Sequence, residues 1–277
     1  MADMGLTEVS AVVMDEVSKF VQAELKQKSV LIPTVQFFTA GPGIDSIKVP
    51  RAGGFTAEDK AENTALTAQV ITFAADSLLL DKHKAVLVRL EDIAQIQATP
   101  DVVAAILARM SSELALAIDT AIFAQLELTS AAAPDHRLAY ADATSLKKAD
   151  LLAARELLHI QNVPFNECTI GVHPSSEKSL LAVDDFVHVD KYGAAGPVQN
   201  GELGRLYGAK VIMSNVFTAA KTVVYHPTHC ALAIQQNLNF KRQDDLENVA
   251  MKFLASQIYG TKVLDSGKRG VLLGTAA

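Results

Sequence analysis

Residues 99–126 read TPDVVAAILARMSSELALAIDTAIFAQL, and this stretch decides the fold class more than any other. Its first three residues supply a cap residue, a proline at the first helical position and an acid in the first turn, which is how an α-helix typically begins. Apolar residues then recur every three or four positions up to Leu126, with no glycine or proline among them. The spacing predicts one helix over residues 100–127, about 40 Å long and about twice the usual length.

Extended segments precede this helix. Residues 46–76 alternate apolar and polar side chains around a polar, glycine-containing centre, which predicts a long β-hairpin with a mobile tip. Its first strand is expected to stop at Pro50, and its second to resume at Leu66. Ser77–Leu80 and Ala85–Leu90, with a tight turn between them, predict a second strand pair. A two-stranded ribbon is marginal alone in water, so the long hairpin is expected to lie on the body of the fold or on a partner chain.

The N-terminal segment also has a helical pattern. Residues 7–28 carry apolar side chains at helical spacing, with acids early and lysines late, as the helix dipole prefers. Two interpretations stay open: a first helix packed on its own domain, or an arm that lies along a neighbouring subunit. Residues 29–38 are predicted to be extended, and Gly41-Pro42-Gly43 is predicted to end that segment.

A second α/β region follows the long helix. The small, polar, proline-containing residues 130–145 suggest a hinge between domains. Ala149–Ile160 is predicted to be an amphipathic helix, and residues 175–181 are helix-like. Short strands are predicted within 167–172, 211–213, 222–225 and 231–234. The final apolar segments, 248–259 and 271–273, are predicted to be helix or strand returning to the first domain.

Composition excludes several classes of function. The net charge of −6 and the lack of a basic stripe argue against tight nucleic-acid binding, although a container for DNA remains compatible. No basic secretion signal and no run of about 18 apolar residues is found, so we expect no membrane association. Cys168 and Cys230 lack metal-type spacing and could form at most one disulfide, which suggests a reduced, cytoplasmic setting.

Three groups of residues resemble chemical sites. His226, His229 and Cys230 are good zinc-ligand types, but Pro227 and the lack of a fourth ligand favour a strand-edge turn. Cys168 with His173 could pair a thiol with a base, yet Cys168 lies in an apolar strand and is better explained as a buried hydrophobic residue. The third group combines carboxylates and an imidazole, and a solvated loop explains it equally well. Its members are Asp184, Asp185, His188 and Asp190.

The glycines of Gly201-Glu-Leu-Gly204-Arg-Leu-Tyr-Gly208 match neither the dinucleotide fingerprint nor the phosphate-binding loop. We expect them to permit tight turns. No catalytic motif is found, so the sequence predicts no enzyme and no catalytic, metal-binding or cofactor-binding residues.

The order of the segments resembles the major capsid proteins of tailed bacteriophages, which have the Hong Kong 97-like fold. Four phrases carry the resemblance locally: Ser77–Asp92 (SLLLDKHKAVLVRLED) leading into the long helix, Ala117-Ile118-Asp119 within it, Gly201–Asn215 (GELGRLYGAKVIMSN), and Phe253–Val263 (FLASQIYGTKV). The likeness spans nearly the whole chain as a diffuse pattern.

This resemblance implies an α+β fold with four parts. They are an N-terminal arm (1–45), an extended β-hairpin loop on the adjacent subunit (46–76), a peripheral domain (77–140 and 235–277) with the spine helix 100–127, and an inserted apical α/β domain (141–234). Some members carry a cleaved N-terminal scaffolding region, whereas only a short arm precedes the fold here, so a separate scaffolding protein is expected or the scaffold is absent. Some members also cross-link their loops; Lys60 and Asn63 lie in this loop but do not by themselves support such a bond.

The resemblance further implies a shell protein that self-assembles as pentamers and hexamers in the host cytoplasm and becomes part of the virion. Its partners would be further copies of itself, a separate scaffolding protein and a portal, and it would enclose double-stranded DNA without sequence-specific binding. No cofactor is implied. Two alternatives stay open: an encapsulin-type nanocompartment that stores an enzyme, and a cytoplasmic metal-dependent hydrolase that uses His226 and His229.

Overall fold

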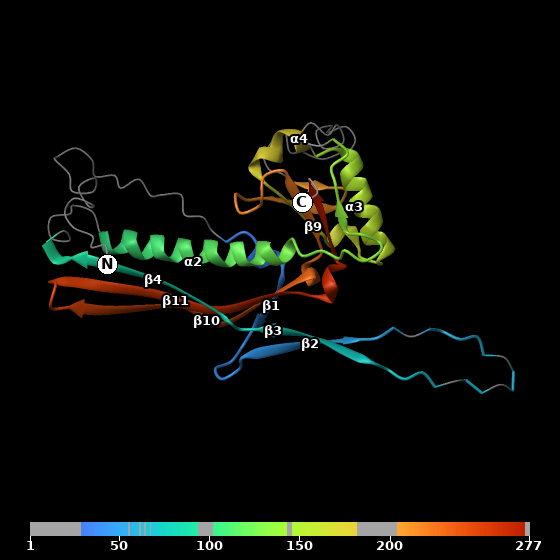
Figure 1. Cartoon of the computed structure of the whole chain (residues 1–277), viewed down its shortest axis with the longest axis horizontal. Coiled ribbons are helices and arrows are strands. Elements are labelled where there is room, and N and C mark those ends of the chain that lie inside the picture. The colour runs from blue at the N-terminus through green and yellow to red at the C-terminus, as the bar shows by residue number, and fades with distance from the viewer. Residues whose placement is uncertain are drawn as a thin grey trace.

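The structure is a computed structural model. It describes residues 29–54, 56–60, 62–63, 65–66, 68–93, 102–142, 146–181 and 204–274. These residues form two bodies, each built on a β-sheet, and a two-stranded ribbon that projects away from both (Figure 1). The predicted helix over 7–28 and the capping residues 99–101 of the long helix lie outside the described residues, as do Gly201 and the cluster from Asp184 to Asp190.

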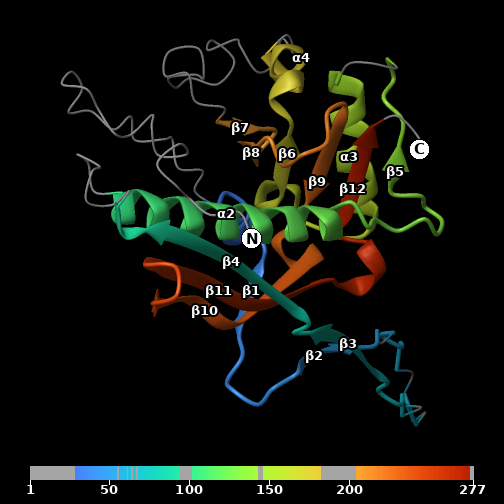
Figure 2. The ribbon, with the colours of Figure 1, turned by 60° about the vertical axis from the view of Figure 1, so that its left-hand side comes forward.

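The four-stranded body has the strand order β1-β10-β11-β4. Its strands are β1 (Gln36–Thr39), β4 (Lys82–Glu91), β10 (Cys230–Asp245) and β11 (Ala250–Val263). β1 runs parallel to β10 and follows a single 3-10 turn at Ile32–Thr34, whereas the other pairs are antiparallel. The long helix α2 (Val102–Leu126) lies along one face of this sheet (Figures 1 and 2).

The periodicity of α2 explains its position. Residues at four-residue spacing are buried along its whole length: Ile106, Met110, Leu114, Ile118 and Ile122. The first three pack against Leu90 of β4 and against Phe253 and Ala255 of β11. Burying one such side chain contributes about 1.5–3 kcal/mol, so this stripe holds the helix on the sheet. The predicted long helix is confirmed over its described residues.

The C-terminal part of α2 also contacts the second body. Ile122 and Leu126 are buried in a cluster with Tyr225 of strand β9, and Phe123 meets Phe217 edge to face at a ring-centroid distance of 5.2 Å. One continuous helix therefore packs against both sheets.

The six-stranded body has the strand order β5-β12-β9-β6-β8-β7. Its strands are β5 (Arg137–Leu138), β6 (Thr169–Val172), β7 (Arg205–Leu206), β8 (Ala209–Met213), β9 (Lys221–Tyr225) and β12 (Gly270–Gly274). α3 (Lys148–Ile160) contributes Leu151, Ala154 and Leu158 to the core below it. The described part of this body also contains a 3-10 turn at Phe165–Glu167, and a second at Pro174–Ser176 that runs into α4 (Glu177–Leu181).

The ribbon consists of β2 (Ser46–Ala52) and β3 (Phe73–Leu79), paired antiparallel from Ser46–Leu79 to Ala52–Phe73. The predicted long hairpin is therefore present, but its strand limits differ from those expected. β2 continues through Pro50, which a two-stranded ribbon tolerates because each strand has one unpaired edge. The second strand begins at Phe73 and not at Leu66.

Strand pairing differs from the sequence prediction in two places. The predicted hairpin of Ser77–Leu80 with Ala85–Leu90 is wrong, because β3 pairs with β2 whereas β4 pairs with β11. The final strand β12 pairs with β9 and β5 and so joins the six-stranded sheet, not the first body to which it was expected to return.

Between the described elements, the chain crosses from one body to the other three times. The crossings follow α2, lie between β9 and β10, and lie between β11 and β12. A 3-10 turn sits in each of the last two, at Pro227–His229 and at Asp265–Gly267. The crossings meet at Gly270: the His136 ring lies within hydrogen-bond distance of its carbonyl (2.8 Å), and the His229 ring fills the space that a Cβ there would need.

Candidate assembly surfaces

The ribbon is the most exposed regular element that the structure describes. The end of the ribbon that joins the four-stranded body, around Leu78, is called its root here. The root is fixed, because Leu78 is buried against Ala231, Ala233 and Leu264. Further out, the amide of Gly53 donates to the carbonyl of Thr72 at 2.8 Å and closes the paired region. Large apolar side chains are exposed beyond the root, at Phe73 of β3 and in the segment before it: Leu66, Val70 and Ile71. Such a concentration of exposed apolar residues in one segment is typical of an interaction surface.

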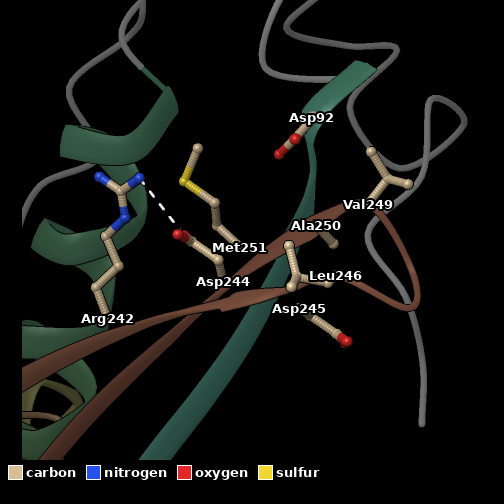
Figure 3. Close-up of a pocket in the computed structure, with 8 residues that line it drawn as sticks. All are labelled: Asp92, Arg242, Asp244, Asp245, Leu246, Val249, Ala250 and Met251. Carbon is tan, nitrogen blue, oxygen red and sulfur yellow. Dashed lines mark ion pairs between the residues drawn. The ribbon is translucent and has the colours of Figure 1, made fainter.

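A second exposed surface lies at the turn between β10 and β11. Leu246 is 90% exposed and Val249 is 68% exposed there. These residues border a hollow of about 310 Å³, which Figure 3 shows with Arg242 and Asp244 paired at 3.6 Å on one side. The hollow is open, and two of its carboxylates, Asp244 and Asp245, pair with cations, so we interpret it as part of a contact surface and not as a catalytic pocket.

An ion cluster stabilises the base of the same turn. Lys252 lies 2.7 Å and Arg89 lies 3.7 Å from Asp245 Oδ2, and Asn248 donates to that oxygen at 3.0 Å. The bond from Lys252, followed by that from Asn248, lowers the pKa of Asp245. Asp245 therefore holds the strand ends of the turn together.

The residues that resembled a zinc site do not converge. His226 is engaged by other partners: its Nδ1 lies 2.8 Å from Thr228 Oγ1 and its Nε2 lies 3.2 Å from Glu167 Oε2. His229 is fully buried against Gly270, and burial raises the pKa of the Cys230 thiol to about 12. Within the described part of the chain, no three His, Cys, Asp or Glu side chains come together as a metal site would require.

The suspected thiol–imidazole pair is also separated. Cys168 Sγ contacts the carbonyl of Pro164 at 3.5 Å, whereas His173 caps its own 3-10 turn through Ser175. Burial raises the pKa of Cys168 to about 12, so the thiolate needed for nucleophilic attack is scarce at neutral pH. Both cysteines are free. Gly208 has a φ of +94° beside Tyr207 at +51°, which confirms a tight turn between β7 and β8.

Asp119 has a structural role that was not predicted from the sequence. It lies fully buried on α2 and accepts hydrogen bonds from Ser29 Oγ (2.5 Å) and from the amides of Val30 (3.0 Å) and Leu31 (3.4 Å). Burial raises the pKa of Asp119 in spite of these bonds, so its ionised form is a cost to the fold. What the carboxylate provides is position: it fixes the first described residues against the long helix.

We expect Asp119→Ala to lower the free energy of unfolding by about 2 kcal/mol, because the buried amide of Leu31 and the partly buried amide of Val30 lose their acceptor. Asp119→Asn keeps one carbonyl oxygen and should lose less. Urea unfolding of the purified variants measures both losses, and a faster proteolytic cleavage near residue 29 in Asp119→Ala would locate the change. Equal stability of all three proteins would contradict the role given to this carboxylate.

Comparisons with known proteins agree with this architecture. The profile of a family described as "Phage capsid protein" matches residues 78–273. Solved structures with similar folds include the capsid of the Cyanophage P-SCSP1u, with a TM-score of 0.75 and 17% identity over 97% of this chain and 94% of that one. A Mycobacterium phage Che8 protein has a TM-score of 0.68 and 21% identity over 83% of this chain and 85% of that one. The capsid of the native GTA particle is similar over 100% of both chains, with a TM-score of 0.73 and 16% identity. A search of curated protein sequences finds no similar protein.

The long helix on a four-stranded sheet, the second α/β body and the projecting ribbon define a capsid subunit with the Hong Kong 97-like fold. The chain belongs to the phage capsid protein family, and it is the major capsid protein of a tailed phage, a structural protein of the virion. Among the described residues, no helix combines the length and apolarity needed to cross a membrane.

Proposed function

We propose that the chain assembles as pentamers and hexamers into an icosahedral shell that encloses double-stranded DNA. One observation carries the assembly part of this proposal: the ribbon projects from the fold (Figure 1) and has no core of its own. Apolar side chains are exposed on it and on the segment that joins its strands. Val70 is 88% exposed and Phe73 is 72% exposed. A stable subunit contact buries about 1,200–2,000 Å² in total, and an adjacent copy is the partner that a repeating shell supplies.

In this proposal each part of the chain has one task. The extended loop (46–76), which contains most of the ribbon and the connection between its strands, lies on the adjacent subunit, and residues 1–45 form an arm. The four-stranded body forms the peripheral domain around α2, and the six-stranded body forms the apical domain near the five- and six-fold axes. Four strands depart from the boundaries expected from sequence: β1 and the first residues of β10 (230–234) pair within the four-stranded sheet, whereas β5 and β12 pair within the six-stranded one.

The acidic balance supports the remaining part of the proposal. A wall with a net charge of −6 per subunit does not hold DNA tightly, which suits a container that is filled and emptied. We further propose a separate scaffolding protein and a portal as partners in assembly. A shell that stores an enzyme, the alternative with the same fold, would differ in its contents.

Removing the outer ribbon tests the assembly proposal. Replacing residues 54–71 with Asn-Gly joins the hydrogen-bonded residues Gly53 and Thr72 by a two-residue turn that suits a hairpin. The variant should keep the wild-type melting temperature, because the ribbon contributes to the core only at its root. It should form few or no shells in electron microscopy of expressed protein, with and without a co-expressed scaffold.

A matched control exchanges exposed apolar residues on another surface. Leu152→Gln and Ile160→Gln lie on α3, where both side chains are exposed, and they should leave shell yield unchanged. Normal shells from the ribbon deletion would contradict the proposed role of the ribbon. Wild-type shells that hold an enzyme cargo and no DNA would instead support the storage alternative.

A further inference from the structure

The 3-10 turn Asp265–Gly267, in the crossing from β11 to β12, has an unfavourable backbone conformation. Its three residues have φ values of +50°, +51° and +76°, and only the last of them is a glycine. Left-handed conformations of non-glycine residues persist where the surrounding contacts enforce them, and they concentrate at elements that change state. The contacts around this turn therefore need an explanation.

The ribbon holds one side of the turn. Arg51 of β2 forms an ion pair with Asp265, and Asp76 of β3 accepts from the amide of Asp265 at 3.1 Å. The segment that follows α2 holds the other side, since the amide of Ser130 donates to the carbonyl of Gly267 at 3.2 Å. The turn is thus fixed between the root of the ribbon and the chain that leaves the long helix.

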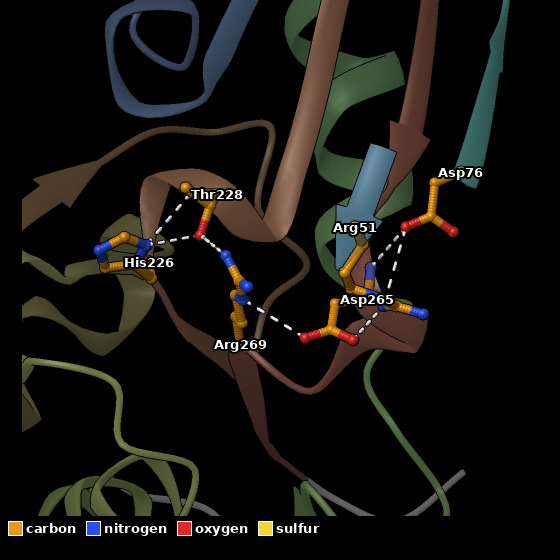
Figure 4. A network of polar contacts seen from close by, with 6 residues as sticks. All are labelled: Arg51, Asp76, His226, Thr228, Asp265 and Arg269. Atoms are coloured by element: carbon orange, nitrogen blue, oxygen red, sulfur yellow. Dashed lines mark hydrogen bonds and ion pairs between the residues drawn. The ribbon is translucent and has the colours of Figure 1, made fainter. Parts of the chain in front are cut away.

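From Asp265 the polar contacts continue into the six-stranded body (Figure 4). Arg269 Nε lies 3.4 Å from Asp265 Oδ2, and the same guanidinium donates to Thr228 Oγ1 at 2.7 Å. Thr228 contacts His226, whose Nε2 lies 3.2 Å from Glu167 on the 3-10 turn before β6. The resulting polar chain runs from the ribbon to the six-stranded body as Arg51, Asp265, Arg269, Thr228, His226 and Glu167.

We propose that the Asp265–Gly267 turn couples the direction of the ribbon to the six-stranded body. While Arg51 is paired with Asp265, the turn keeps its left-handed conformation and Arg269 stays aimed at Thr228. When the ribbon moves and Arg51 leaves, the turn relaxes and Arg269 loses Thr228, so the change reaches the Pro227–His229 turn and Glu167. Each exposed ion pair alone is weak, and the coupling depends on the pairs sharing one turn. Its use in shell assembly rests on the proposed function, whereas the coupling itself belongs to a single subunit.

Hydrogen–deuterium exchange of the purified full-length protein tests the coupling. Arg51→Gln should speed exchange at residues 264–269 and also at 226–229 and 165–168, by about threefold or more. Arg51→Lys, which keeps the charge, should restore most of the protection. Arg269→Gln should give the same remote effect, and the double variant should add little to either single one.

Lys48→Gln is the matched control, because Lys48 is an exposed cation on the same strand and its loss changes charge alone. It should leave exchange at 165–168 unchanged. Faster exchange confined to the ribbon root in Arg51→Gln would overturn the proposal, as would additive effects in the double variant. These exchange measurements do not depend on shell formation. The ribbon deletion can therefore contradict the assembly proposal while the coupling holds, and the exchange data can contradict the coupling while the assembly proposal holds.

Discussion

Replacing Gly260 by alanine is expected to lower the free energy of unfolding by about 3 kcal/mol. Gly260 lies on β11 where the second strand of the ribbon crosses it, and a Cβ there would sit 1.9 Å from the carbonyl oxygen of Leu79 and 3.2 Å from Cα of Leu80. Both are backbone atoms, so no side-chain rotation relieves the clash. Either β11 bends or the root of the ribbon moves away, and both disturb the core around Leu78.

Urea unfolding of the purified protein measures this loss. Gly41→Ala serves as the control, because the added methyl would meet only Ile44 Cδ1 at 3.9 Å, and its stability should stay within about 0.5 kcal/mol of wild type. Gly260→Ala shells, where they form, should show a displaced ribbon in electron microscopy. A Gly260→Ala protein as stable as wild type would mean that the two strands do not cross this closely.

The long helix could be predicted from sequence because its evidence is local. A four-residue spacing of apolar side chains is sufficient to define a buried stripe, and the structure buries Ile106, Met110, Leu114 and Ile118 as that spacing requires. Ala117, at the edge of the stripe, is only half-buried. Local spacing thus identified the helix and its contact face without any knowledge of the partner strands.

Strand partners could not be predicted in the same way, because pairing depends on contacts between residues far apart in the chain. β3 and β4 are separated only by Leu80 and Asp81, which suggested a hairpin. A two-residue hairpin turn favours Asn-Gly or similar residues with positive φ, and this pair lacks a glycine. The lack of a hairpin turn sequence at Leu80-Asp81 was therefore visible in the sequence. It indicates that the chain passes from one sheet to the next at this point and does not fold back on itself.

The candidate surfaces were predictable only in part. The exposed ribbon followed from its alternation and its polar centre. The partners of Arg51 did not, because Asp265 lies 214 residues away and neither residue belongs to a recognisable motif.

Asp119 had a detectable signal, since an acid directly after Ile118 falls within the apolar arc of the helix. A charged residue on a buried helix face requires partners, and here the chain at 29–31 supplies them.

Acidification is expected to destabilise the subunit through His229. Burial lowers the pKa of His229 to about 4 from 6.5, with the Leu126 carbonyl opposing the shift and His136 adding to it. Between these two pH values the unfolded chain binds a proton that the folded chain does not. The stability that neutral His229 contributes is therefore present above pH 6.5 and is lost as the pH falls toward 4, by about 3 kcal/mol in total.

The free energy of unfolding at pH 7 and at pH 4, in wild type and in His229→Met, isolates this contribution. The wild type should lose about 3 kcal/mol more than the variant between the two pH values, because methionine fills the site without binding a proton. Val223→Ala is the control: it shortens a buried side chain on β9 and changes no titratable group. Its loss of stability should be equal at both pH values. If His229→Met keeps the full pH dependence of the wild type, other groups cause the acid sensitivity. If it loses that dependence, protonation of His229, which lies against Gly270 at the crossing between the two bodies, causes the acid sensitivity.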